Sequence, residues 1–197
     1  MIFDCAGKSL DLSVPRIMGI INVTPDSFSD GGKFFDRDAA LKQAEKLISD
    51  GADILDIGGE STRPGSDIVA EQEEIERVAP VIEMISAEFD IPISIDTMKP
   101  GVMTAAVKAG AGLINDVNAL RMEGALEAAV ELKVPVCLMH MQGTPQTMQQ
   151  EPHYDDVVTE VKTFLLERVD TCLKAGIKAE HIMLDPGFGF GKRARHN

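Results

Sequence analysis

The chain has 197 residues, which is enough for one folded domain with a substantial core. Its hydrophobic content of 44% argues against disorder, and it contains no apolar run of the roughly 20 residues that a membrane-spanning helix needs. A formal net charge of −13 argues against a nucleic-acid partner, because phosphate binding needs a basic surface. The first residues lack the basic start and apolar segment of a signal peptide, so we expect a cytoplasmic protein.

Short apolar runs alternate with helical patterns along the chain. Residues 1–15, with a Gly-Lys turn and Pro15, predict a small hairpin or cap. Apolar runs bounded by turn residues predict six strands, and helical periodicity or acidic first turns predict helices between most of them. The predicted strands are 17–24, 53–61, 92–96, 113–117, 135–140 and 182–185, and the predicted helices are 36–49, a Glu-rich helix ending near 89, 100–109, 123–132 and 155–175.

Six β/α units allow two architectures, an open doubly wound sheet or a (β/α)8 barrel with units missing. Polar residues end nearly every predicted strand, whereas a doubly wound sheet concentrates its site at one switch point. We therefore predict an α/β fold of the (β/α)8 TIM-barrel type, with residues 1–197 forming a single domain that is truncated at its C-terminal end. Eight units need about 250 residues, so we expect a cut chain or a partner that supplies the remainder.

The polar residues that end the strands form the first candidate site, because ligands of parallel α/β folds bind at the carboxyl ends of the strands. As isolated residues, Asp at a strand end is often a helix cap, and Thr97 and Asp116 could be only that. Asp96, Asn115 and Asp185 together offer acceptors and a carboxamide that suit a heterocycle with adjacent N–H donors, such as a 2-amino-pyrimidinone. The polar termini of the six runs are Asn22, Glu60 after Asp56, Asp96, Asn115 with Asp116, His140 and Asp185.

Three loops after predicted strands carry candidate motifs. The segment 24–32, TPDSFSDGG, is either a turn with a helix cap or a mobile lid, and Phe28 at its centre favours the lid. The segment 58–65, GGESTRPG, offers glycines and Arg63 to an anion, or is a loop with an incidental arginine. The segment 186–192, PGFGFGK, fits neither a P-loop nor G-x-G-x-x-G, so we interpret its glycines as a turn that presents Phe188 or Phe190 to a flat ligand.

The cysteines and histidines give little support to a metal site. The three cysteines show no C-x-x-C spacing, so we expect buried or free thiols. The four histidines lack zinc-ligand spacing, and His140 is interpreted as a hydrogen-bonded residue at a strand end.

Six motifs, in this order and spacing, resemble the dihydropteroate synthase family of the folate pathway. They are NVTPDSFSDGG, DIGGESTRPG, SIDT, INDV, LMHMQGTP and DPGFGFGK, and the match covers essentially the whole chain. The resemblance implies a (β/α)8 barrel. It also implies condensation of 7,8-dihydropterin-6-ylmethyl diphosphate with p-aminobenzoate, with release of pyrophosphate and a requirement for Mg²⁺, and competition by sulfonamides for the aminobenzoate site.

Residue by residue, the resemblance implies a pterin site formed from the predicted strand ends. Asp96, Asn115 and Asp185 would hold the pterin ring. Met139 and Phe190 would lie along its faces.

The resemblance implies that the remaining site residues come mainly from two loops. Thr62, with Phe28 and Pro64 nearby, would frame the aminobenzoate, and Asn22 would lie at the Mg²⁺–pyrophosphate end. The residues implied to be catalytic, on loops that order over the reacting centre, are Asp30 and Arg63.

The sequence lacks the family's final two β/α units. With them it lacks a lysine and a serine after the seventh strand and an Arg-x-His after the eighth, which bind the substrates in the family. We therefore expect turnover and a homodimer for a full-length form, and no useful catalysis by a polypeptide limited to these 197 residues. Two alternatives stay open: a pterin-dependent methyltransferase, which needs no pyrophosphate site, and a non-catalytic pterin-binding fragment.

Overall fold

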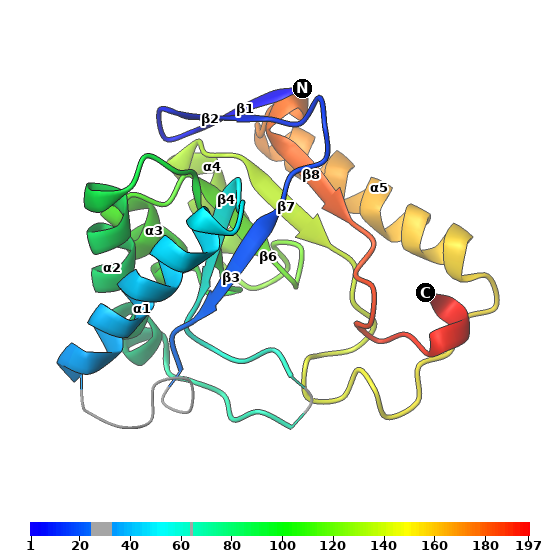
Figure 1. Cartoon of the computed structure of the whole chain (residues 1–197). Helices are drawn as coiled ribbons and strands as arrows, with labels where there is room; N and C mark the ends of the chain where they lie inside the picture. Colours follow the sequence, from blue (N-terminus) through cyan, green and yellow to red (C-terminus); the bar gives the residue numbers. More distant parts are fainter. Residues whose placement is uncertain (25–32, 64) are drawn as a thin grey trace.

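A computed structural model describes residues 1–24, 33–63 and 65–197, with the side chains of 33–37 excepted. It contains a two-stranded antiparallel hairpin and a six-stranded parallel sheet (Figure 1). The strands are β1 (Ile2–Cys5), β2 (Lys8–Asp11), β3 (Met18–Asn22), β4 (Ile54–Gly58), β5 (Ile93–Asp96), β6 (Leu113–Asp116), β7 (Val136–Met139) and β8 (Ile182–Asp185). The α-helices are α1 (Lys33–Ser49), α2 (Glu71–Glu88), α3 (Pro100–Ala109), α4 (Ala125–Leu132) and α5 (Val157–Ala175).

The order of the strands in the sheet decides between the two predicted architectures. Strands β3 to β8 neighbour one another in the order of the sequence, and every adjacent pair is parallel. A doubly wound sheet would reverse its strand order at a switch point, whereas a barrel does not. The prediction of an incomplete (β/α)8 barrel is confirmed, since the chain folds as consecutive β/α units of that architecture.

The main core lies between the sheet and the helices. Leu55, Ile57 and Ile95 pack with Val78 and Ile82 of α2 and are fully or almost fully buried. This layer explains why alternate residues of the strands are buried and apolar, because the helices cover the outer face of the sheet.

The hairpin closes the amino-terminal end of the barrel. Phe3, Cys5 and Leu10 are buried and pack against Leu113 of β6. A Cβ atom at Gly112 would lie 2.2 Å from the backbone carbon of Cys5, so only glycine permits this approach. The predicted hairpin is therefore confirmed, and it lies across the end of the sheet opposite to the loops that follow the strands (Figure 1).

The predicted elements agree with the structure in number and order, and differ at their ends. The first two strands of the sheet stop at Asn22 and Gly58, earlier than predicted, because the residues that follow leave the ladder to form loops. Helix α1 begins at Lys33 rather than at Asp36, and α4 begins at Ala125 rather than at 123. Within the described part of the chain, no helix is both long and apolar enough to cross a lipid bilayer.

Candidate active site at the carboxyl ends of the strands

The sheet register places four candidate residues in one row. Asn22 pairs with Gly58, Gly58 with Asp96, and Asp96 with Asn115. A Cβ atom on Gly58 would lie 3.5 Å from Asn22 Oδ1 and 3.6 Å from Asp96 Oδ2. The side chains of Asn22 and Asp96 therefore flank a space that the glycine leaves open.

A second carboxylate lies one layer deeper in the barrel interior. Asp56 is 4% exposed, and its Oδ2 atom accepts a 3.0 Å hydrogen bond from Asn115 Nδ2. The Oδ1 atoms of both Asp56 and Asp96 are buried without a hydrogen-bond partner among the described residues. An unpaired buried acceptor is costly, which is typical of a group that a ligand completes.

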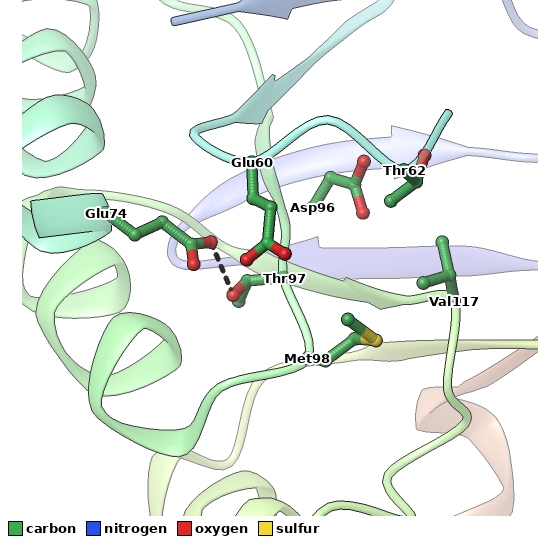
Figure 2. Close-up of a pocket in the computed structure, with 7 residues that line it drawn as sticks. All are labelled: Glu60, Thr62, Glu74, Asp96, Thr97, Met98 and Val117. Carbon is green, nitrogen blue, oxygen red and sulfur yellow. Dashed lines mark hydrogen bonds between the residues drawn. The ribbon is translucent and has the colours of Figure 1, made fainter. Parts of the chain in front are cut away.

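A pocket opens beside Asp96. Figure 2 shows the side chains around it, which come from the ends of β5 and β6, from the loop after β4 and from α2. Its lining combines carboxylates and hydroxyls with apolar side chains, as small-molecule sites do. The lining residues are Glu60, Thr62, Glu74, Asp96, Thr97, Met98 and Val117.

The carboxylates of this region disfavour one another's ionised forms. Burial raises the pKa of Asp96 well above its usual range, and the nearby Asp56, Asp116, Glu74 and Glu60 raise it further. Burial also raises the pKa of Asp56, although the hydrogen bond from Asn115 opposes this. A ligand that donates N–H groups to Asp96 would offset this repulsion and favour the ionised carboxylate.

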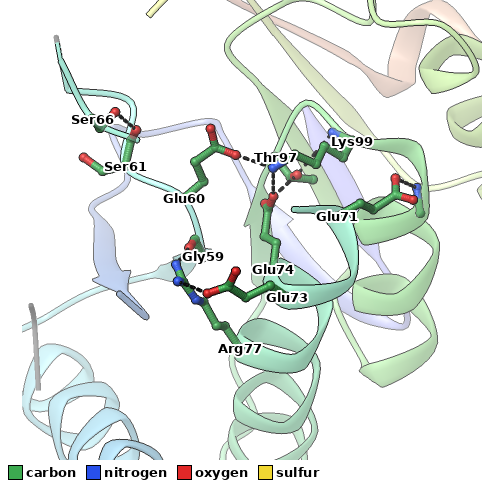
Figure 3. Close-up of polar contacts among 11 residues, drawn as sticks. Gly59, Glu60, Ser61, Ser66, Glu71, Glu73, Glu74, Arg77, Thr97 and Lys99 are labelled. Carbon is green, nitrogen blue, oxygen red and sulfur yellow. Dashed lines mark hydrogen bonds and ion pairs between the residues drawn. The ribbon is translucent and has the colours of Figure 1, made fainter. Parts of the chain in front are cut away.

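One lysine compensates part of this charge. Lys99, which is 8% exposed, forms ion pairs with Glu60 and Glu74 (Figure 3). The Thr97 hydroxyl donates a 2.7 Å hydrogen bond to Glu74 Oε1 and accepts one of 3.2 Å from the Lys99 amide. Thr97 therefore holds the turn before α3, but the predicted role as a helix cap is wrong, because the N-cap residue of α3 is Lys99 and receives no side-chain cap hydrogen bond.

The loop after β4 is held in shape by its own hydrogen bonds. Ser66 Oγ donates to the carbonyl oxygens of Ser61, at 2.5 Å, and of Arg63, at 2.8 Å. Thr62 is half-buried against the pocket, whereas Arg63 is exposed. The loop thus turns Thr62 toward the site and leaves the arginine in solvent.

A second cluster lies at the ends of β7 and β8. Met139 pairs with Asp185 in the sheet register, and Asp185 Oδ1 accepts a 2.7 Å hydrogen bond from the Gly187 amide. Phe190 packs against an apolar group of Val117, Met139, Met141 and Met148. This cluster places an apolar group of side chains next to a carboxylate.

The glycine-rich loop is organised around Lys192. Its Nζ lies 2.9 Å from His140 Nδ1 and donates to the carbonyl oxygens of Gly187, at 2.9 Å, and Phe190, at 3.1 Å. The three glycines of the loop all have positive φ, which confirms the predicted turn. Burial lowers the pKa of His140 to about 4, with the charge of Lys192 contributing, so this histidine accepts as a neutral ring.

The structure brings most of the predicted site residues to one rim. Asn22, Asp96, Asn115 and Thr62 gather near the ends of β3 to β6, and Met139, Asp185 and Phe190 gather near the ends of β7 and β8. Phe28, Asp30 and Pro64 lie outside the described residues. Asp116 caps a turn, since its carboxylate accepts from the amides of Asn118 and Leu120.

Four buried polar residues of this rim were not predicted as site residues. Asp56, within the second strand, had a signal in the sequence, because a carboxylate inside an apolar run must find a partner. The others, Glu74, Lys99 and Lys192, lie in helical or loop segments where the sequence gives no sign of their burial.

Comparison with known proteins places this geometry in a family. Residues 18–197 match the family model described as "Pterin binding enzyme". The dihydropteroate synthase of Haemophilus influenzae is 57% identical over 190 residues, a match that covers 96% of this chain and 69% of the relative. The dihydropteroate synthase of Escherichia coli K12 is 55% identical, with 97% and 68% covered.

Solved structures agree with these relatives. The dihydropteroate synthase of Yersinia pestis, solved as a complex with a sulfonamide drug, superposes with a TM-score of 0.94 at 52% identity and covers 100% of this chain and 72% of that one. The synthase of Xanthomonas albilineans in complex with 7,8-dihydropteroate gives 0.89 at 52% identity, with 100% and 70% covered. The chain therefore belongs to the dihydropteroate synthase family of pterin-binding enzymes.

Proposed function

We propose that this chain forms the pterin-binding part of a dihydropteroate synthase active site. The reaction condenses 7,8-dihydropterin-6-ylmethyl diphosphate with p-aminobenzoate to 7,8-dihydropteroate and pyrophosphate. The observation that carries the proposal is the unpaired, buried Oδ1 atom of Asp96 beside a pocket at the carboxyl ends of the strands. We further propose that residues 1–197 belong to one pterin-binding barrel domain.

The pterin ring is assigned to the row of polar residues and to the apolar cluster next to it. Asp96 and Asp185 would accept hydrogen bonds from its N–H groups, and Asn115 would offer the carboxamide oxygen, because its Nδ2 already donates to Asp56. The packing of Met139 and Phe190 in one apolar cluster supports their assignment to the faces of the ring.

Aminobenzoate is assigned to the loop after β4. The position of Thr62 in the lining of the pocket supports this assignment. Phe28 and Pro64 would complete the aminobenzoate site, and Asp30 and Arg63 would act at the reacting centre. These four roles rest on the family resemblance of their motifs.

Magnesium is assigned to the exposed carboxamide of Asn22. A Mg²⁺ ion commonly uses one or two protein oxygens and completes its shell with water and substrate phosphate, which fits a single carboxamide beside the open space at Gly58. Among the described residues, no group of three or more His, Cys, Asp or Glu side chains could hold a metal by itself. When bound, the ion would stabilise negative charge on the departing pyrophosphate.

The residues of this chain would act mainly by positioning and electrostatics. Breaking the C–O bond to pyrophosphate develops positive charge on the pterin methylene, and a carboxylate such as Asp30 would stabilise it. The arylamine is a neutral nucleophile that needs no strong base, so alignment of the two substrates supplies much of the rate. Loops closing over the centre would exclude water, which otherwise captures the cation.

Further partners follow from the same assignment. Sulfonamides would compete for the aminobenzoate position, in line with the sulfonamide complex of the Yersinia pestis relative. We also propose a cytoplasmic location and a homodimer for the full-length protein. The methyltransferase alternative receives no support from the relatives named above, which are synthases.

The direct test is pyrophosphate release by the full-length protein. We expect release only when pterin diphosphate, aminobenzoate and Mg²⁺ are all present. Pterin binding without any turnover would favour the non-catalytic alternative. Failure of both binding and turnover would refute the assignment of the site.

A substitution at the end of β8 separates ligand binding from loop capping. Asp185→Asn removes a charge-assisted hydrogen bond to the pterin, so we expect pterin affinity to fall tenfold or more, roughly 1.4 kcal/mol. The measurement is titration calorimetry together with urea unfolding. Unchanged affinity alongside lost stability would show that Asp185 serves only to cap the Gly187 turn.

A further inference from the structure

The base of the loop after β4 is fixed by residues outside the predicted site. Glu60, the residue before Ser61 and Thr62, forms an ion pair with Lys99, which also pairs with Glu74 of α2 (Figure 3). The preceding carbonyl oxygen, of Gly59, accepts a 2.8 Å hydrogen bond from Arg77 Nη1. Consecutive residues of the loop are thus tied to α2 and to the start of α3.

Packing leaves the base of the loop no freedom to move toward the helix. A Cβ atom at Gly59 would lie 2.7 Å from Val78 Cγ1 and 2.8 Å from Glu74 Cγ, so the backbone already touches α2. Movement in the other direction would break the ion pair between Glu60 and Lys99. The position of Thr62, two residues further along, therefore depends on that ion pair.

The same lysine controls the charge next to Asp96. Glu60, Glu74 and Asp96 line one pocket, so the two glutamates face the carboxylate assigned to the pterin. With Lys99 the two glutamates and the lysine carry one net negative charge, and without it they would carry two. The other charged groups that face Asp96 are Asp56 of β4 and Asp116 of β6, and both are acidic.

We propose that Lys99 is a positioning residue of this active site, which anchors the loop of Thr62 and Arg63 through Glu60 and compensates the carboxylates that surround Asp96. The inference rests on the proposed function, since it concerns the same pocket. Lys99 itself reaches no reacting atom in this role, because its ammonium group is engaged by the two glutamates. Its effect on the substrates is exerted through Glu60 and Asp96.

The experiment compares the pH dependence of pterin binding in the full-length protein and in Lys99→Met. Ionised Asp96 is needed to accept from the pterin, and uncompensated like charges raise the pKa of a carboxyl by about one unit or more. Calorimetric titrations with pterin diphosphate at a series of pH values give an affinity that falls on the acid side, which is the acid limb of the profile. We expect this acid limb to lie about one pH unit higher in Lys99→Met than in the wild type. Lys108→Met, which removes an exposed lysine of α3, is the matched control and should leave the limb in place.

A second variant isolates the anchoring role and covers the case in which Lys99→Met does not fold. Glu60→Gln removes the ion pair to the loop and one negative charge near Asp96. We expect the KM for aminobenzoate to rise threefold or more, while the acid limb of pterin binding moves to lower pH. Lys99→Arg keeps the positive charge between Glu60 and Glu74, so it should stay closer to the wild type than Lys99→Met in the pH dependence of pterin binding.

The outcomes distinguish this inference from the proposed function. A wild-type protein that neither binds pterin nor releases pyrophosphate would refute the proposed function. Wild-type activity with an unmoved pH limb in Lys99→Met, or with an unchanged aminobenzoate KM in Glu60→Gln, would overturn the role of Lys99 alone.

Discussion

Two buried lysines lie at the same rim of the barrel and are held in opposite ways. Lys99 is surrounded by the carboxylates of Glu60 and Glu74, whereas Lys192 is surrounded by a neutral imidazole and backbone carbonyl oxygens. Burial by itself would lower the pKa of both lysines. At Lys99 the two glutamates outweigh burial and the pKa is raised, while at Lys192 it falls to about 8, partly opposed by Asp185.

The difference shows how each end of the site is stabilised. The β4–β6 side contains excess acid, so its lysine is needed for charge balance and would leave carboxylates unpaired if removed. On the β7–β8 side the groups that accept from Lys192 are neutral, so this lysine acts as a hydrogen-bond donor that ties the glycine-rich loop to the end of β7. We therefore expect the stability of the β4–β6 side to depend on charge balance, and that of the β7–β8 side to depend on hydrogen bonds.

The largest expected effect is the loss of Lys99. Lys99→Met leaves two buried carboxylates without their cation, so we expect the free energy of unfolding to fall by about 3–5 kcal/mol. Urea denaturation of this variant and of Lys108→Met measures the effect. A loss of stability no greater than that of Lys108→Met would show that Lys99 does not stabilise the fold through its pairing with Glu60 and Glu74.

Removal of Lys192 should cost less. Lys192→Met leaves His140 Nδ1 and the Phe190 carbonyl oxygen without this donor, whereas the Gly187 carbonyl oxygen keeps the amide of Phe190, which predicts a loss of about 1–3 kcal/mol. The same urea experiment compares it directly with Lys99→Met. A larger loss in the free energy of unfolding for Lys192→Met than for Lys99→Met would contradict the proposed difference between charge balance at Lys99 and hydrogen bonding at Lys192.

A substitution on the acidic side should change stability in the other direction. Asp96 has a buried, unpaired Oδ1 atom, and its pKa is raised by burial and by four neighbouring carboxylates. A raised carboxyl pKa means that ionisation opposes folding, so Asp96→Asn should stabilise the protein by about 1 kcal/mol at neutral pH while weakening pterin binding. This gain should vanish below pH about 4, where both folded and unfolded forms are protonated. Unfolding at pH 4 and pH 7 checks the sign.

The smallest expected effect is a pH dependence of Lys192. Its folded pKa of about 8 lies below its ordinary value of 10.5, so between these values the unfolded chain binds more protons. Stability should therefore rise with pH in this window, relative to Lys192→Met, by a few tenths to about 1 kcal/mol. Parallel unfolding curves of the two proteins at pH 7.5 and pH 10 measure it. A relative decrease would mean that the lysine is held as a firmly stabilised cation.

The order of the elements and most of the strand-end residues could be predicted from the amino-acid sequence. Alternating apolar runs and helical segments specify consecutive β/α units, because both periodicities are local properties of the chain. The parallel arrangement then brings the ends of β5, β6 and β8 to one rim, so Asp96, Asn115 and Asp185 could be predicted there. Helix ends could not be predicted to the residue, as α1 and α4 show.

The pairing of the buried charges follows only from the folded arrangement of the chain. Lys99 pairs with glutamates 39 and 25 positions away, and Asn115 pairs with Asp56 across 59 positions. Such pairs depend on strand register and on the seating of α2 against the loop, which no local pattern of residues encodes. The positions of Asp96 and Asn115 follow from the sequence, whereas the partners that set their charge and orientation follow only from the fold.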